Sequence, residues 1–185
     1  MKRIILFVTI IIALLSLVAC GGNNTTGPKG PKKVFQPDWY SVQDNADYLY
    51  AYGKAEKVSE NASSDAAVAN AYLEAAQYVK SHVKGMLKNY LEEAGNENPE
   101  VTSLTSKVVK VVSNAKFQNT SVTKRETFQM ANNRYKTFVR VSIPKAEINK
   151  NLLNQVKHEE ALYNQFKASQ SFKELENEVE KNSGN

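Results

Sequence analysis

The run YLYAYGKAEKV at residues 48–58 decides the fold, because its side chains alternate between two kinds. Tyr48, Tyr50 and Tyr52 would point to one side of a β-strand, and small residues around Gly53 would point to the other. A glycine within a face of small residues indicates that a helix lies close against the strand. We interpret the tyrosine side as sheet surface or core rather than as a platform for stacking a ligand.

The segment that follows predicts that helix. Apolar residues recur at three- and four-residue steps from Val68 to Tyr90, and Gly95 ends the pattern. Its many alanines favour a helix and would allow close packing on the small side of the strand. Three residues could cap the first turn: Ser63, Ser64 and Asp65.

A second helix is predicted directly afterwards. Asn98 is placed to cap it, and Pro99 would occupy its first turn. Apolar residues then keep a helical period as far as Ala115. The segment is rich in valine, however, and β-branched residues would suit a strand equally well. The sequence therefore leaves helix and strand open here, with helix preferred.

The second half of the chain predicts a β-hairpin and then helix. Apolar residues alternate in runs at 122–130 and 135–143, in a register that would place them on one face of the hairpin. The two asparagines between the runs tolerate the positive φ of a tight turn. Pro144 would end the second strand and begin a long helix reaching Phe166. The charged segment 169–185 is interpreted as a solvated helical extension, with a partner-binding helix as the alternative.

Together these elements predict an α+β fold. We expect a small antiparallel sheet of about three strands, in the order β-α-α-β-β-α, packed by helices and followed by a long C-terminal helix. The folded domain is expected to span residues 37–168, and the charged helical tail residues 169–185.

The amino-terminal end predicts secretion and a lipid anchor. Lys2 and Arg3 precede an apolar run that falls short of the roughly 20 residues a membrane-spanning helix requires. The run ends in four residues that resemble a lipobox: Leu17, Val18, Ala19 and Cys20. Signal peptidase would recognise the first three, remove residues 1–19 and leave a lipid-modified cysteine. Two or more acyl chains suffice for stable anchoring.

Residues 20–36 are predicted to form a lipidated flexible linker, because Gly, Pro, Asn and Thr cannot bury apolar surface. The part after the cysteine would reach about 20 to 24 Å. Gly21, directly after the cysteine, is compatible with export to an outer membrane. The chain has 1 cysteine, so lipidation leaves no thiol for a disulfide. Without Lys2 and Arg3, 22 basic residues face 19 acidic ones, and this charge of +3 is too mild to indicate a nucleic-acid partner.

The order of these features resembles the Lpp-twenty lipoprotein family, over about residues 37–156. The matching segments after the linker are PDW at 37–39, YGKA at 52–55, the alanine-rich helix, and YKTFVRV at 135–141 leading to Ile148. The resemblance implies a compact α+β domain on an outer-membrane lipoprotein. Members of the family are noted as surface antigens, and related domains occur in flagellum-associated envelope proteins. The family has no agreed enzymatic activity, so the resemblance implies no catalytic residues.

Patterns that carry catalysis or bind metals are not found in the sequence. His82 is interpreted as a surface or partly buried helix residue. His158 begins a HEE run, but Leu162 occupies the position where a metalloprotease helix needs its second histidine. The acidic pairs at 92–93 and 159–160 are adjacent, so their side chains would not face each other as an acid and a base must. We interpret them as parts of solvated helix faces. We predict a non-enzymatic protein with no metal and no cofactor other than its covalent lipid.

The basic residues of the predicted hairpin form a candidate interaction surface: Lys124, Arg134, Lys136 and Arg140. Arg125 need not share their face, and a solvated sheet surface is the alternative. The predicted function is that of an outer-membrane-anchored binding or structural module of the cell envelope. It would dock an envelope or appendage protein through its sheet or C-terminal helix, without nucleic acid or a small-molecule substrate. An envelope enzyme acting on wall polymers and a surface adhesin or antigen are the alternatives.

Overall fold

The computed structural model describes residues 34–42, 44–95, 99–117 and 119–183. The predicted signal peptide, the lipobox and Cys20 lie outside these residues. Residues 36–185 belong to one compact unit. Its elements, in chain order, are β1 (Tyr48–Lys57), α2 (Glu60–Ala94), α3 (Pro99–Ser113), β2 (Ser121–Gln129), β3 (Tyr135–Pro144), α4 (Lys145–His158), α5 (Glu160–Phe166) and α6 (Gln170–Ser183). Within the described residues, no helix combines the length and the apolar character needed to cross a membrane.

The predicted α+β class and its three-stranded sheet are confirmed. The strands pair antiparallel in the order β1-β3-β2, so β3 lies in the middle and β1 at one edge. β2 and β3 form the predicted hairpin, and Asn133 in its turn has a φ of 56°. The segment left open between helix and strand is the helix α3.

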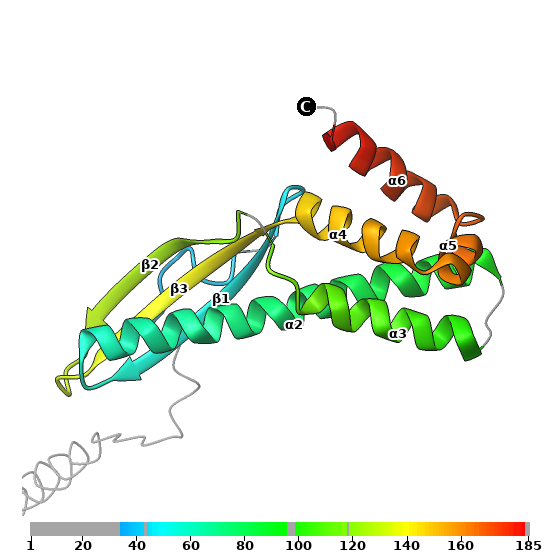
Figure 1. Ribbon diagram of the computed structural model, residues 1–185. Coiled ribbons are helices and arrows are strands. Elements are labelled where there is room, and N and C mark those ends of the chain that lie inside the picture. The colour runs from blue at the N-terminus through cyan, green and yellow to red at the C-terminus, as the bar shows by residue number, and fades with distance from the viewer. Residues whose placement is uncertain (1–33, 43, 96–98, 118, 184–185) are drawn as a thin grey trace, which may run out of the picture. The chain divides into compact units, whose positions relative to one another are not determined.

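Helix α2 covers one face of the sheet (Figure 1), and its backbone lies directly against the strand at Gly53. A Cβ atom added to Gly53 would lie 2.0 Å from the carbonyl oxygen of Ala67 and 2.4 Å from the backbone nitrogen of Ala71. Both alanines are fully buried. The close contact predicted from the small residues of the strand is therefore confirmed, and it depends on glycine having no side chain.

Helix α2 begins earlier than the sequence predicts. Its N-cap is Ser59, whose hydroxyl oxygen accepts a hydrogen bond from the backbone N–H of Ala62 (3.2 Å). Ser63, one of the expected caps, is instead buried inside the helix and donates its hydroxyl hydrogen to the carbonyl oxygen of Ala55 in β1 (2.9 Å). The prediction of the cap is wrong because Ser63 is used to join the helix to the strand.

The second half of α2 extends beyond the sheet and packs against α3, α4, α5 and α6 (Figure 1). The helix has 35 residues and is therefore about 52 Å long. It ends as predicted at Gly95, which has a φ of 72° and donates its N–H to the carbonyl oxygen of Leu91. One helix thus joins the sheet to the helical part of the unit.

A β-bulge between Val122 and Lys124 changes which side of the sheet the residues of β2 face. Val122 pairs with Val141, on the side covered by α2, whereas Phe128 pairs with Lys136, on the opposite side. An extra residue in one strand reverses the alternation beyond it. The expectation that the apolar residues of the hairpin all share one face is wrong for β2.

The C-terminal region consists of three helices, α4, α5 and α6, where one long helix and a tail were expected. The first break falls at Glu159, whose backbone is extended (φ −104°, ψ 92°). The second precedes α6, where Ser169 accepts a hydrogen bond from the N–H of Phe172 (3.1 Å) and caps the helix. These breaks let the chain fold back on itself and present several apolar faces to the core.

The interpretation of residues 169–185 as a solvated extension is wrong for the described part. Phe172 is fully buried and Leu175 is 3% exposed. The ring of Tyr90 in α2 contacts the rings of Phe166 and Phe172 edge to face, at centroid distances of 5.5 and 5.4 Å. Helix α6 is therefore part of the core, and the compact unit continues past residue 168.

Candidate functional site

The sheet face opposite α2 is covered in part by the segment that precedes β1. The ring of Tyr40 packs edge to face on the rings of Tyr52 and Phe138, with both centroid distances 5.1 Å. The indole N–H of Trp39 donates to the carboxylate of Glu126 in β2. Tyr52 and Phe138 are buried as a result. The segment is thereby held on the sheet and reaches the edge formed by β1.

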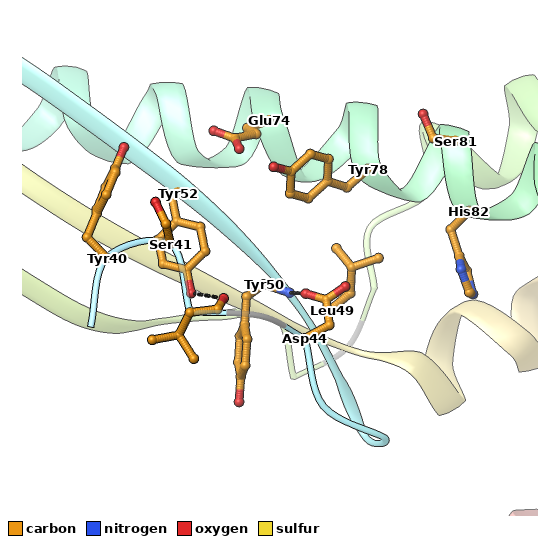
Figure 2. Close-up of a pocket in the computed structure, with 11 residues that line it drawn as sticks. Tyr40, Ser41, Asp44, Leu49, Tyr50, Tyr52, Glu74, Tyr78, Ser81 and His82 are labelled. Atoms are coloured by element: carbon orange, nitrogen blue, oxygen red, sulfur yellow. Dashed lines mark hydrogen bonds between the residues drawn. The ribbon is translucent and has the colours of Figure 1, made fainter. Parts of the chain in front are cut away.

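A surface pocket of about 640 Å³ lies at this edge, between the segment before β1, β1 itself and one flank of α2 (Figure 2). Its lining is rich in hydroxyl groups and contains two carboxylates and a histidine. These side chains are Tyr40, Tyr50, Tyr52, Tyr78, Ser41, Ser81, Asp44, Glu74 and His82. No lysine or arginine is among the lining residues. The pocket is therefore acidic and aromatic.

Hydrogen bonds hold the outer wall of the pocket in place. The backbone N–H of Tyr50 donates to Asp44 Oδ1 (2.7 Å), and the hydroxyl of Tyr52 donates to the carbonyl oxygen of Val42 (2.6 Å), as Figure 2 shows. Ser41 has a φ of 71°, a left-handed conformation that costs a non-glycine residue energy. Strained residues of this kind are found preferentially at functional sites.

The inner wall belongs to α2, where Glu74 and Tyr78 are four residues apart and share one side of the helix. A hydrogen bond to Glu74, together with burial, raises the pKa of Tyr78 to about 12. Burial, followed by the charge of Glu74, raises the pKa of Tyr40. The pKa of Tyr52 is also raised, chiefly by burial. These hydroxyls therefore remain protonated at neutral pH and can donate hydrogen bonds.

His82 is partly buried on α2, as the sequence indicates, but it also lies at the end of the pocket (Figure 2). Burial, followed by the positive charge of Lys145, lowers its pKa. The imidazole is therefore neutral at pH 7. His158 is exposed at the end of α4, away from the pocket lining.

The structure brings three of the four predicted basic residues onto one face. Lys124 pairs with Arg140, and Lys136 is an even number of residues from Arg140 on β3, so all three share the side opposite α2. Arg125 pairs with Val139 and points to the other side. The fourth residue, Arg134, lies at the hairpin turn.

These basic side chains contact neighbouring groups of the sheet. The guanidinium of Arg140 lies 4.4 Å from the ring centroid of Tyr50, and its Nε donates to Thr123 Oγ1 (3.1 Å). The ammonium of Lys136 lies 5.4 Å from the ring centroid of Phe138. Arg134 Nε is 3.2 Å from a carboxylate oxygen of Glu56. Their contacts with aromatic rings and Glu56 stabilise the sheet, and an interaction role for them stays a prediction.

One residue of each adjacent acidic pair, Glu93 and Glu159, contacts another helix. Glu93 accepts hydrogen bonds from Ser169 Oγ (2.7 Å) and from the N–H of Ser171 (2.9 Å), at the start of α6. The hydrogen bonds from Ser171, followed by that from Ser169, lower the pKa of Glu93 to about 2. Glu159 pairs with Lys107 of α3 (2.6 Å). Glu93 is exposed, as expected, whereas Glu159 is half-buried by its contact with α3, which the sequence did not predict.

Sequence reasoning missed the pocket. The spacing of Glu74, Tyr78 and His82 places them on one flank of a helix, and the pattern was visible. That Asp44 and Tyr40 lie opposite this flank depends on how the segment before β1 folds over the sheet. No group of three His, Cys, Asp or Glu side chains that could hold a metal ion occurs within the described residues.

Comparisons with known proteins do not assign this chain to a family. The chain matches no family model, no curated protein and no solved structure.

Proposed function

We propose that this chain is an outer-membrane lipoprotein, tethered by lipid on Cys20, whose folded unit binds a partner in the cell envelope without catalysing a reaction. The resemblance to the Lpp-twenty family supports the location and the lack of catalysis. The pocket at the edge of β1 is the proposed binding site. An envelope or appendage protein is the proposed partner.

The single observation that carries this proposal is the combination of tyrosines and carboxylates in one preformed pocket. Aromatic faces bind cations and flat apolar groups, and carboxylates accept hydrogen bonds from amines and hydroxyls. A protruding lysine or arginine side chain of a partner protein fits both. The hydrogen bonds that fix Asp44 and the Tyr52 hydroxyl reduce the cost of ordering the site on binding.

A bulky side chain placed in the pocket tests the proposal. Ser81 is exposed and lines the pocket, whereas Asn89 is exposed on the same helix and does not. Chemical crosslinking of whole lipidated protein in intact membranes should recover neighbours with wild type and with Asn89→Trp, and lose them with Ser81→Trp. Cys20→Ser should release the protein from the membrane. Unchanged neighbours in Ser81→Trp would remove the pocket from the proposal.

An envelope enzyme acting on wall polymers is the second candidate, because Asp44 and Glu74 both line the pocket. Two carboxylates that flank a glycosidic bond are the usual machinery of glycoside hydrolysis. In the structure Asp44 Oδ1 accepts a hydrogen bond from the backbone N–H of Tyr50, which favours a binding role for Asp44. The test is whether wild type releases soluble fragments from purified cell wall and whether Glu74→Gln and Asp44→Asn abolish this release. Both results together would favour the enzyme over the binding protein.

A further inference from the structure

The flank of α2 away from the pocket borders a second surface feature, a groove of about 580 Å³ between α2 and α3. Its lining contains three lysines: Lys80, Lys84 and Lys110. All three are exposed. No aspartate or glutamate lines the groove, and within the part of the chain that the structure describes no ion pair is formed by these lysines. The groove therefore carries uncompensated positive charge.

The other lining groups make the groove suited to an interface between water and lipid. Leu73, at one end, is 61% exposed. The hydroxyls of Thr105, Ser106 and Ser113 donate to carbonyl oxygens of their own helix, so they do not compete with the lysines for a ligand. Lysines around an exposed apolar side chain are typical of helical surfaces that rest on anionic membranes.

We propose that this α2–α3 groove docks on the anionic lipid headgroups of the membrane that holds the anchor. The inference rests on the lipid anchor of the proposed function, because the linker of about 20 to 24 Å keeps the folded unit within reach of the surface. Lysine ammonium groups bind phosphate as point charges. Anionic headgroups supply that chemistry at a surface, which the exposed lysines of the groove can reach together.

Docking through the groove fixes how the pocket is presented. On α2, Lys80 and Lys84 are separated from Tyr78 by about 120° to 160° around the helix axis. The acidic pocket and the basic groove therefore occupy different flanks of the same helix. With the groove on the headgroups, the pocket opens away from the bilayer, toward a partner in the envelope.

A single introduced cysteine tests the inference on the whole lipidated chain. Cys20 is the only cysteine and is acylated in the anchored form, so Ser106→Cys provides one labelling site in the groove, and Tyr78→Cys one in the pocket. Each fluorescently labelled protein is placed in phosphatidylcholine vesicles, with or without phosphatidylglycerol, containing a nitroxide-headgroup quencher. We expect strong quenching of the groove label only with phosphatidylglycerol, and weak quenching of the pocket label in both.

Charge removal gives the decisive comparison. Neutralising the three groove lysines to glutamine should shift the docking equilibrium on the order of a hundredfold and remove the dependence on phosphatidylglycerol. Exposed lysines on α4 and α6 provide a matched control with the same loss of charge: Lys150→Gln, Lys173→Gln and Lys181→Gln. This control should dock like wild type. Circular dichroism of both triple variants checks that they fold.

Four outcomes would overturn the inference. Equal quenching of both labels shows that no particular face docks. Equal docking of the groove variant and wild type shows that these lysines do not act. If two labels attach per chain and the protein leaves the vesicles, Cys20 carries no lipid, and the anchor of the proposed function fails as well. A vesicle-bound, singly labelled chain with an unquenched groove overturns this inference alone.

Discussion

The two halves of α2 pack in different ways, although they belong to one helix. The first half presents alanines to the sheet, and the helix backbone touches the strand at Gly53. The second half presents larger residues to the other helices, and Tyr90 joins an aromatic cluster with Phe166 and Phe172. The first contact depends on the absence of a side chain at Gly53, and the second depends on large aromatic side chains. They should therefore fail under opposite substitutions.

The largest effect is expected for Gly53→Ala. The added methyl would overlap backbone atoms of Ala67 and Ala71, which no side-chain rotation can relieve. We expect unfolding free energy to fall by more than about 4 kcal/mol, in the exceptional range for one substitution. Gly85→Ala is the matched control, because nothing lies within 4 Å of its added methyl. It should stabilise α2 by about 0.5 to 1 kcal/mol. Denaturant unfolding measures both, and similar values would contradict the close contact.

The next effect concerns the second half of α2. Phe172→Ala removes a fully buried ring from the cluster around Tyr90. We expect a loss of about 3 to 4 kcal/mol of unfolding free energy, from lost burial and the cavity left behind. The neighbouring exposed Lys173→Ala should change it by less than about 0.5 kcal/mol. If the two variants unfolded at the same denaturant concentration, α6 would lie outside the core.

A smaller and pH-dependent effect is expected at the junction of α2 and α6. The pKa of Glu93 is lowered from 4.5 to about 2 by hydrogen bonds from Ser171 and Ser169. A carboxyl group whose pKa is lowered by folding stabilises the folded state at pH values above its pKa in the unfolded chain. This stability is lost as pH falls from about 4.5 to 2. The protection of α6 amides, measured relative to the intrinsic exchange rate at each pH, should therefore fall across this window in wild type. Glu93→Gln should accelerate exchange at pH 7 and flatten the dependence; a variant matching wild type at both ends would argue against this contact.

The smallest effect is expected on the solvent side of the same half-helix. Lys88 and Glu92 form an ion pair of 3.3 Å at four-residue spacing, with both side chains mostly exposed. Solvent screens such pairs, so a double-mutant cycle with Lys88→Ala and Glu92→Ala should give a coupling of about 0.3 to 0.5 kcal/mol. High salt should reduce it further. A coupling comparable to the loss in Phe172→Ala would mean that surface charge, rather than the cluster, stabilises this half.

Local patterns predicted much of the fold because their causes are local. Gly53 and the alanines after it predicted that a helix packs closely on the strand, and the two asparagines predicted the hairpin turn. The bulge between Val122 and Lys124 was not predicted, because a single unpaired residue cannot be recognised from the alternation of apolar and polar residues in the sequence. Ser63 was misjudged as a cap because its partner, Ala55, lies on another element.

The candidate site was harder to predict than the fold. Its inner wall follows from helical spacing, but its outer wall consists of residues that reach the edge of β1 only after Tyr40 packs on Phe138. The C-terminal tail was misread for a related reason. Its charged residues dominate its composition, while Phe172, Leu175 and Val179 form an apolar stripe that becomes core only when α2 lies beside it.

The sequence by itself determined the α+β class, the presence of a first strand and a later hairpin, and the requirement for glycine at position 53. These features follow from periodicity and backbone sterics, which act between neighbours in the chain. Only the tertiary structure decided that α6 belongs to the core, that Glu93 accepts hydrogen bonds at the start of α6, and that α2 separates an acidic pocket from a basic groove. Those features depend on contacts between residues far apart in sequence, and such contacts are set by how whole elements pack.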